Sequence, residues 1–226
     1  MTLDVLFEDN HCLAVNKPAG LPSQADSSGS ACLVDLASSY IKTKYSKPGD
    51  VYLGLVHRLD RPTSGVVLLA RTSKAASRLS AQFRAGTIEK VYWALVEGAP
   101  AEPDGEWIDR IEKFSDQNIS RILPVSSTAG KEARVRYRVL EPMGRLTKIE
   151  LRPGTGRGHQ LRVQLAHRGL PIMGDVKYGA SSGLRALDGG SRIALHAYGL
   201  GFTHPTRREA IWVEAPPPAD WPMRGR

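Results

Sequence analysis

The chain has 226 residues, which is long enough for one large domain or two small ones with a buried core that needs no disulfide bonds. Its two cysteines, Cys12 and Cys32, lie in apolar or small-residue surroundings without a Cys-x-x-Cys spacing, which favours buried thiols over a disulfide or metal site and is typical of a reducing compartment. The 31 Lys and Arg residues against 23 Asp and Glu give a formal net charge of +8, an excess that indicates a polyanionic partner.

The amino terminus lacks the basic start and apolar run of a signal peptide, and no stretch approaches the roughly 18 apolar residues of a membrane span. We therefore expect a cytoplasmic protein without membrane contact. Arginine, whose planar guanidinium suits phosphates and base edges, recurs in groups. These groups are Arg134, Arg136 and Arg138; Arg152, Arg157 and Arg162; and Arg207 with Arg208. A basic surface that only aids solubility is the alternative explanation.

The first part of the chain alternates short apolar runs with turns. Residues 3–7 and 12–15 predict a β-hairpin, and residues 30–45 carry apolar side chains at helical spacing. The apolar run 64–70 predicts a strand buried on both faces. Ser73 is a candidate cap for a helix that ends at Gly86.

The rest of the chain is mostly predicted sheet. Strand candidates cover residues 88–97, 107–113, 119–125, 133–140, 146–151 and 193–202. A helix is expected over 159–167, a mobile loop over 179–190 and an extended surface tail from 215 onward. With no internal repeat and no clear linker, the simplest interpretation is a single α+β domain over residues 1–226, with a mixed, largely antiparallel central sheet flanked by helices. Two lobes joined through one continuous sheet are the alternative.

A single carboxylate, Asp60, lies between Arg58 and Arg61 in a turn before the apolar strand. Opposite charge within a few ångströms lowers an Asp pKa by about 1–3 units, so this turn would present an anion. The same residues form turns readily, and Asp60 accepting only local backbone hydrogen bonds is the structural alternative.

Two later segments also concentrate functional residue types. Tyr92 lies in the alternating strand 88–97, where an ordinary sheet tyrosine is the simpler interpretation. Residues 151–165 form a glycine-rich loop that opens a helix, and backbone amides there would hold a phosphate with help from Arg157, although neither a P-loop nor a Rossmann fingerprint is present. Arg162, one turn into that helix, would reach inward to a carboxylate or, by default, outward to solvent.

Metal-ligand residue types are scattered through the chain at His57, Asp60, His159, Asp175 and His196. No His-x-x-x-His or Cys-x-x-Cys pair places two ligands on one element, so a metal site is not favoured. The Gly-x-Ser-x-Gly elbow of a serine hydrolase is also missing.

Four stretches, in this order, resemble the RluA-type pseudouridine synthases. Residues 6–22 resemble the family's amino-terminal segment, and His57-Arg58-Leu59-Asp60 with Thr63-Ser64-Gly65 resembles its catalytic motif. The family's second motif is matched by Lys90-Val91-Tyr92 with Ala94, Val96 and Gly98. Its third motif is matched by Thr155-Gly156-Arg157 and His159-Gln160-Leu161-Arg162, and the likeness continues to Pro171–Asp175 and Tyr178-Gly179. The likeness extends from about residue 6 to residue 202. Gly158 departs from it, since the family usually has Thr or Ser there.

The resemblance implies an isomerase that cuts the bond between ribose and N1 of a uridine in RNA, turns the uracil and joins C5 to the ribose, with no cofactor and no metal. It assigns catalysis to Asp60, Tyr92 and Arg162. Asp60 would act as a nucleophile or as a base, and Arg162 would pair with Asp60 and hold it anionic. Tyr92 would pack against the flipped uracil and assist removal of the proton from C5.

RNA contacts are implied for Arg58, His57, Arg157, His159 and Gln160. Arg58 would fill the stack that the flipped base leaves or hold the rearranged RNA, because such a base must leave its helix at a cost of a few kcal/mol. Arg157 would bind phosphate or, like Arg162, pair with Asp60. We expect a monomer, without the separate amino-terminal RNA-binding domain that some members carry. The target, in ribosomal or transfer RNA, is expected to be chosen by residues 179–190 and 134–138.

Two other functions are weighed against the synthase. A non-catalytic RNA-binding module of the same fold would share the basic surface but would have little reason to keep Asp60, Tyr92 and Arg162 together. A metal-dependent hydrolase would use His57, Asp60 and His159, and its activity would depend on the metal.

Overall fold

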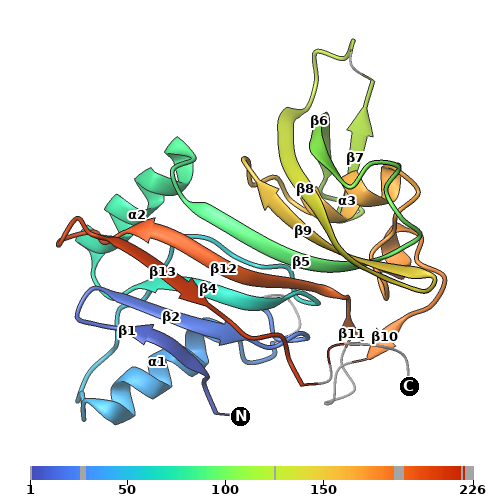
Figure 1. Cartoon of the computed structure of the whole chain (residues 1–226). Helices are drawn as coiled ribbons and strands as arrows, with labels where there is room; N and C mark the ends of the chain where they lie inside the picture. The colour runs from blue at the N-terminus through green and yellow to red at the C-terminus, as the bar shows by residue number, and fades with distance from the viewer. Residues whose placement is uncertain (1, 26–28, 125, 186–190, 220, 222–226) are drawn as a thin grey trace. The chain divides into compact units, whose positions relative to one another are not determined.

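The computed structural model describes residues 2–25, 29–124, 126–185, 191–219 and 221 (Figure 1). The chain divides into two compact units: unit 1 consists of Met1–Glu89 and Ala197–Pro218, and unit 2 of Lys90–His196 and Ala219–Arg226. Both are built from largely antiparallel strands with helices packed against them, which confirms the α+β class.

Unit 1 is a sheet with the strand order β1-β2-β4-β12, to which β3 and β13 add by pairing with β4 and β12. The strands are β1 (Val5–Glu8), β2 (Cys12–Lys17), β3 (Gly54–Leu55), β4 (Ser64–Ala70), β12 (Leu195–Thr203) and β13 (Ala210–Glu214). β1 and β2 form the predicted antiparallel hairpin. β13 was not predicted, although Ile211 and Val213 alternate in burial with the exposed Ala210, Trp212 and Glu214, as in a strand with one buried face.

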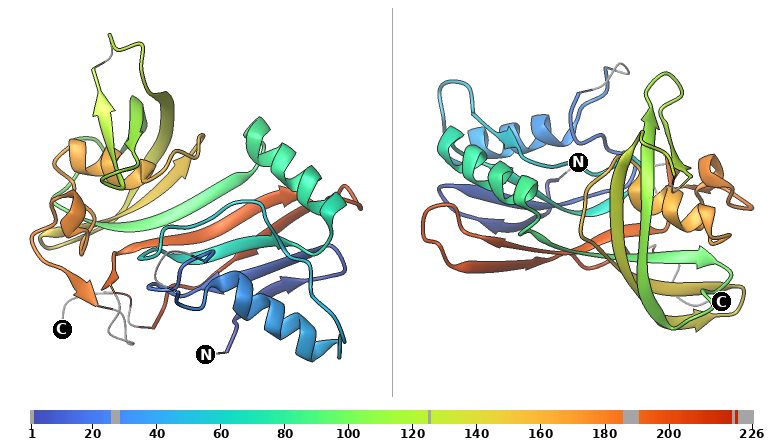
Figure 2. Two further views of the ribbon diagram at one scale, coloured as in Figure 1. Left: turned by 180° about the vertical axis from the view of Figure 1, so that it is seen from behind. Right: turned by 90° about the horizontal axis from the view of Figure 1, so that it is seen from above.

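β4 is buried along its whole length, which confirms the strand predicted to be covered on both faces. Two helices, α1 (Leu33–Lys44) and α2 (Ser73–Ala85), lie beside the strands of this unit (Figure 2). The cap of α2 is one residue earlier than predicted, because the side chain of Thr72, and not Ser73, accepts a hydrogen bond of 3.1 Å from the Ala75 amide. Gly86 ends α2 in the left-handed conformation, as predicted.

Unit 2 contains the strand order β5-β9-β8-β6-β7. The strands are β5 (Glu89–Glu97), β6 (Asp104–Phe114), β7 (Ile119–Leu123), β8 (Lys131–Met143) and β9 (Leu146–Pro153). The helix α3 (Gln160–His167) and the short helix η1 (Val176–Tyr178) follow β9. Leu161 and Leu165 of α3 pack in the core of this unit with Val135 and Leu151 from the sheet.

Two sequence predictions near the carboxyl end change. Part of the expected loop 179–190 is strand, since β10 (Leu184–Arg185) pairs with β11 (Ser191–Arg192), while residues 186–190 lie outside the described part of the chain. The tail is not simply a surface segment, because Trp221 is 3% exposed and packs in the core cluster of unit 2. Within the described residues, no helix has both the length and the apolar character needed to cross a membrane.

Candidate active site

Asp60 lies half-buried in the turn that leads into β4. The turn is closed by a hydrogen bond of 3.0 Å from the Thr63 amide to the Asp60 carbonyl. On its other side, the Ser23 hydroxyl donates to the Leu59 carbonyl at 2.8 Å and accepts from the Leu59 amide at 3.2 Å. The backbone that carries the carboxylate is therefore fixed at both ends, which favours a defined position for Asp60.

Lys17 joins this turn to the preceding loop and was not singled out from the sequence. Its ammonium group is fully buried and donates to the carbonyls of Pro18, Leu21 and Arg61 at 2.8, 2.8 and 3.2 Å. Burial lowers the pKa of Lys17 to about 7, with the Asp60 carboxylate acting in the opposite direction and Arg61 in the same one. Lys17 thus ties the loop after β2 to the turn that carries Asp60, through the Arg61 carbonyl next to that carboxylate.

The two residues predicted to contact RNA beside Asp60 differ in their surroundings. His57 is half-buried, accepts a hydrogen bond of 2.9 Å from the Leu68 amide at Nε2 and stacks on Phe83 with ring centroids 4.6 Å apart. Arg58 is exposed and forms no hydrogen bond or ion pair among the described residues. His57 therefore holds the turn against β4 and α2, whereas the Arg58 side chain is accessible to a ligand.

Tyr92 lies in β5 opposite Leu151 of β9 and packs, half-buried, against the core of unit 2. Ala94, Leu95 and Val96 of the same strand are all fully buried, so this strand fills both of its faces as predicted. Asp60 belongs to unit 1 and Tyr92 to unit 2. Their convergence in one site stays a prediction.

Gln160 organises the glycine-rich loop before α3. The side chain is 5% exposed; its Oε1 accepts from the Thr155 hydroxyl at 2.8 Å and the Arg157 amide at 3.0 Å, and its Nε2 donates to the Arg134 carbonyl at 3.1 Å. Arg157 donates from Nε to the Glu132 carbonyl at 2.8 Å. The loop is therefore held by its own side chains, and the predicted RNA contacts of Gln160 and Arg157 stay predictions.

Arg162 is buried, so the default orientation toward solvent is excluded. Its Nε and Nη2 donate to the two carboxylate oxygens of Asp175 at 2.7 and 2.8 Å, a two-point pair in which both side chains are nearly inaccessible. The guanidinium also lies over the ring of Tyr178, with Cζ 5.0 Å from the ring centroid. Asp175 fixes the direction of this arginine, while the expected pairing of Arg162 with Asp60 stays a prediction.

A hydrogen-bonded chain extends from Tyr178 to the start of α3. The Tyr178 hydroxyl accepts from the Ser120 amide and shares a hydrogen bond with His159 Nδ1, each at 2.8 Å. His159, at φ 53°, is the left-handed residue from which α3 begins. Ser120 donates to the Gly158 carbonyl at 2.6 Å. Gly158, where the family usually has Thr or Ser, is exposed, and a Cβ there would lie 3.2 Å from the Lys113 side chain, which is flexible enough to move aside.

One cluster of metal-ligand types is found in the described residues, and it differs from the candidates noted in the sequence. Asp9, Cys12 and His204 have ligand atoms within 4.8 Å of one another. His204 Nδ1 accepts from the Arg207 amide at 2.9 Å, so its proton is on Nε2, which is 2.7 Å from Asp9 Oδ2. Burial raises the pKa of the Cys12 thiol to about 12, and Arg207 pairs with Asp9 at 3.0 Å. These contacts tie two turns of unit 1 together and do not favour a cation.

Comparison with known proteins places the chain among enzymes that act on RNA. The profile described as RNA pseudouridylate synthase matches residues 11–167. The ribosomal large subunit pseudouridine synthase D of Zymomonas mobilis is 36% identical over 225 residues, covering 96% of this chain and 70% of that protein. The tRNA pseudouridine synthase C of Haemophilus ducreyi is 36% identical, covering 99% and 94%.

The length of the match varies between relatives. This chain covers 65% of the ribosomal large subunit pseudouridine synthase C of Vibrio vulnificus, at 33% identity. The solved structure of human RNA pseudouridylate synthase domain containing 4 superimposes with a TM-score of 0.79 at 26% identity, covering 96% of this chain and 90% of that one.

Proposed function

This chain belongs to the RNA pseudouridylate synthase family and is an isomerase of uridine in RNA, and we propose that Asp60 is the group that starts its reaction. The observation that carries this proposal is the Asp60 turn, in which a half-buried carboxylate is held by fixed backbone and the buried Lys17 side chain donates to the Arg61 carbonyl of the same turn. A carboxylate presented in this way is suited to attack, or to remove a proton from, the sugar of a bound nucleotide.

The proposed reaction conserves all atoms of the uridine. The bond between ribose C1′ and uracil N1 breaks, the uracil turns within the site, a bond forms between C1′ and C5, and the proton on C5 is lost while N1 gains one. Asp60 acts on the sugar as nucleophile or base. Tyr92 packs against the turned uracil, and Arg162, directed by Asp175, stabilises the negative charge of Asp60.

The substrate is proposed to be a uridine in ribosomal or transfer RNA. The relatives named above include synthases for both classes of RNA, and the formal net charge of +8 suits a polyanion. The target uridine is stacked in its RNA and has to be flipped out. The proposed role of Arg58, which is exposed and two residues before Asp60, is to fill the vacated stack or to hold the rearranged RNA.

The direct test is pseudouridine mapping in total RNA from cells with and without the gene, complemented by variants of the protein. We expect at least one pseudouridine to disappear without the gene and to return with the wild-type protein but not with Asp60→Asn. Asp50→Asn, which changes an exposed aspartate upstream of the same turn, is the matched control and should restore the modification.

Pseudouridine formation by Asp60→Asn at the wild-type rate would show that another group starts the reaction. If the purified protein binds RNA tightly but forms pseudouridine in no class of cellular RNA, the non-catalytic binding module would be the better explanation.

A further inference from the structure

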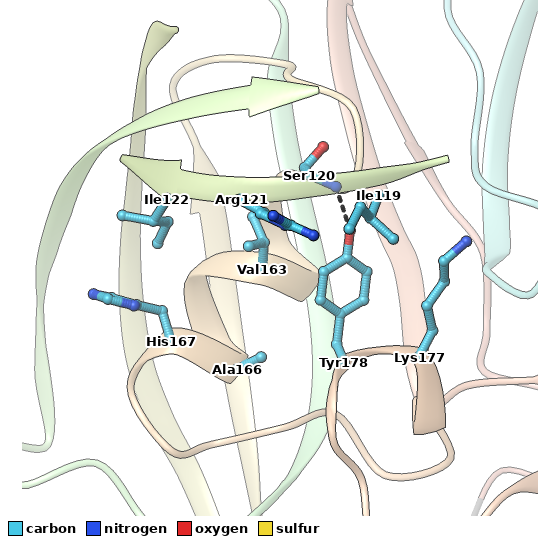
Figure 3. Close-up of a pocket in the computed structure, with 9 residues that line it drawn as sticks. All are labelled: Ile119, Ser120, Arg121, Ile122, Val163, Ala166, His167, Lys177 and Tyr178. Atoms are coloured by element: carbon cyan, nitrogen blue, oxygen red, sulfur yellow. Dashed lines mark hydrogen bonds between the residues drawn. The ribbon is translucent and has the colours of Figure 1, made fainter. Parts of the chain in front are cut away.

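Unit 2 contains a cavity of about 360 Å³ between β7, α3 and η1 (Figure 3). Its walls are Ile119 to Ile122 from β7, Val163, Ala166 and His167 from α3, and Lys177 with Tyr178 from η1. None of the residues assigned above to chemistry lines it. The volume is in the range of roughly 300–1,000 Å³ that is usual for small-molecule sites in proteins.

The walls of this cavity separate into an apolar part and a basic part. Ile119, Ile122, Val163 and Ala166 give it apolar walls, whereas the side chains of Arg121, His167 and Lys177 are exposed. Figure 3 shows His167 and Lys177 at opposite ends, with the side chains of α3 between them. No acidic residue is among the nine that line the cavity. An occupant with a flat apolar body and negative charge at its edge fits this arrangement.

The basic side chains of the cavity are available to a ligand. Arg121, His167 and Lys177 form no ion pair with any residue in the described part of the chain. Arg121 is nevertheless directed, because Nη2 donates to Gln117 Oε1 at 3.0 Å and the guanidinium lies 5.0 Å from the centroid of the Phe114 ring. A phosphate that reaches this rim therefore displaces no carboxylate.

The cavity also adjoins the residues that position Arg162. Tyr178 forms part of its wall, and the guanidinium of Arg162 lies over the ring of that tyrosine. The Tyr178 hydroxyl is held by the Ser120 amide and His159 Nδ1, so the wall is rigid. A group bound in the cavity would therefore contact α3, the helix that carries Arg162.

We propose that this cavity, lined by β7, α3 and η1, binds an unstacked nucleotide of the substrate RNA other than the uridine that is isomerised. Its base lies against the apolar wall, and the phosphates beside it contact Lys177 and Arg121. This inference rests on the proposed function, since it supplies a second anchor for an RNA that must be opened to release its target base.

The test measures binding of a fluorescent single-stranded oligouridine of about ten nucleotides to protein carrying Asp60→Asn, which prevents turnover. The double variant Arg121→Ala, Lys177→Ala should raise Kd about tenfold and reduce the slope of log Kd against log salt by about 1.4, the value for two lost phosphate contacts on a single strand. The control double variant Lys42→Ala, Lys74→Ala removes two exposed charges from α1 and α2 and should change Kd less than twofold.

A second variant tests the apolar wall without changing charge. Ala166→Trp should fill part of the cavity and raise Kd for oligouridine while leaving the salt slope unchanged. Should its melting curve show a loss of folding, the Arg121 and Lys177 double variant carries the test alone, because both of its substitutions are at exposed side chains.

The outcomes separate this site from the proposed function. Equal Kd and equal slope for the two double variants would overturn the cavity proposal, whether or not the protein forms pseudouridine. Binding of free UMP or of an acidic peptide that depends on Lys177 while oligouridine binding does not would overturn it as well. The oligouridine assay stays decisive even if no RNA becomes modified, because it requires no turnover.

Discussion

The guanidinium of Arg162 is held by a carboxylate at two of its nitrogens. Arginine presents five N–H donors in a planar fork, and Asp175 takes those on Nε and Nη2. Both side chains are almost inaccessible to solvent, so the pair needs good hydrogen-bond geometry to offset the cost of desolvation. Removal of one partner would leave a buried charge uncompensated. Asp175 is therefore a positioning residue for the function proposed for Arg162.

Replacing Asp175 with Asn tests this role. The substitution keeps the shape of the side chain but removes its charge and one of the two acceptors, so we expect a loss of about 3 kcal/mol in the free energy of unfolding. Turnover of RNA, measured in single-turnover experiments at saturating protein, should fall at least tenfold, with a much smaller change in RNA affinity.

Asp109→Asn provides the matched control for this variant. Asp109 receives Arg168 at 3.0 and 3.1 Å, a two-point pair at the other end of α3 that involves no residue assigned to chemistry. It should lower stability by about 1 kcal/mol, since the pair is partly exposed, and leave the single-turnover rate within twofold. Equal losses of rate in both variants would mean that Asp175 only stabilises the fold.

The sequence indicated the candidate residues better than their partners. Asp60, Tyr92 and Arg162 were selected because their motifs match a family, and this selection needs no knowledge of contacts. Lys17 and Asp175 were quoted within those motifs but given no role in the site, because their partners are three carbonyl groups in one case and an arginine thirteen residues away in the other. Contacts of either kind leave no trace in the local alternation of apolar and polar residues.

At the scale of elements, strands with one or two buried faces were predictable, because alternation or a continuous apolar run is visible within a few residues. β4, β5 and α2 follow their sequence patterns closely. The segment that departs most from its prediction is the tail around Trp221, whose burial depends on packing with the core cluster of unit 2, whose other buried members lie between residues 94 and 195. The run of prolines in this tail does not indicate a contact with core residues so far away in the sequence.

Gly65, the second residue of β4, shows why a glycine is needed just after the Asp60 turn. Its φ is +116°, and a Cβ there would lie 2.2 Å from the Ala197 carbonyl oxygen of β12. Backbone atoms cannot move aside as a flexible side chain can, so β4 and β12 would have to separate. We expect Gly65→Ala to lower the free energy of unfolding by about 2–4 kcal/mol, measured by urea denaturation.

Gly144→Ala separates the clash from backbone strain. Gly144 also has a positive φ, +69°, but nothing lies within 4 Å of a Cβ built there. This variant should lose only the conformational cost of a left-handed alanine, about 1 kcal/mol. A loss at Gly65 no larger than that at Gly144 would show that the approach of β12 is not what requires the glycine.

For the whole molecule, the formal charge overstates the positive surface that RNA can use. The arginines of β8 and β9 that alternate along the sheet are paired with glutamates: Arg134 and Arg136 with Glu106, and Arg138 and Arg152 with Glu150. Such exposed pairs contribute little to stability, yet an RNA phosphate has to compete with the carboxylate. Arg58 and Lys177, in contrast, have no carboxylate partner among the described residues.

The salt dependence of RNA binding should reflect this division. With Asp60→Asn to prevent turnover, six phosphate contacts would give a slope of log affinity against log salt of about −4 to −5. Arg58→Ala should reduce that slope by about 0.7–0.9, the value of one lost contact, whereas Arg136→Ala with Arg138→Ala should reduce it by less than about 0.5 although it removes two charges. A reduction of about 1.5 by the double variant would instead place β8 on the RNA, and residues 134–138 would then be the place to look for target choice.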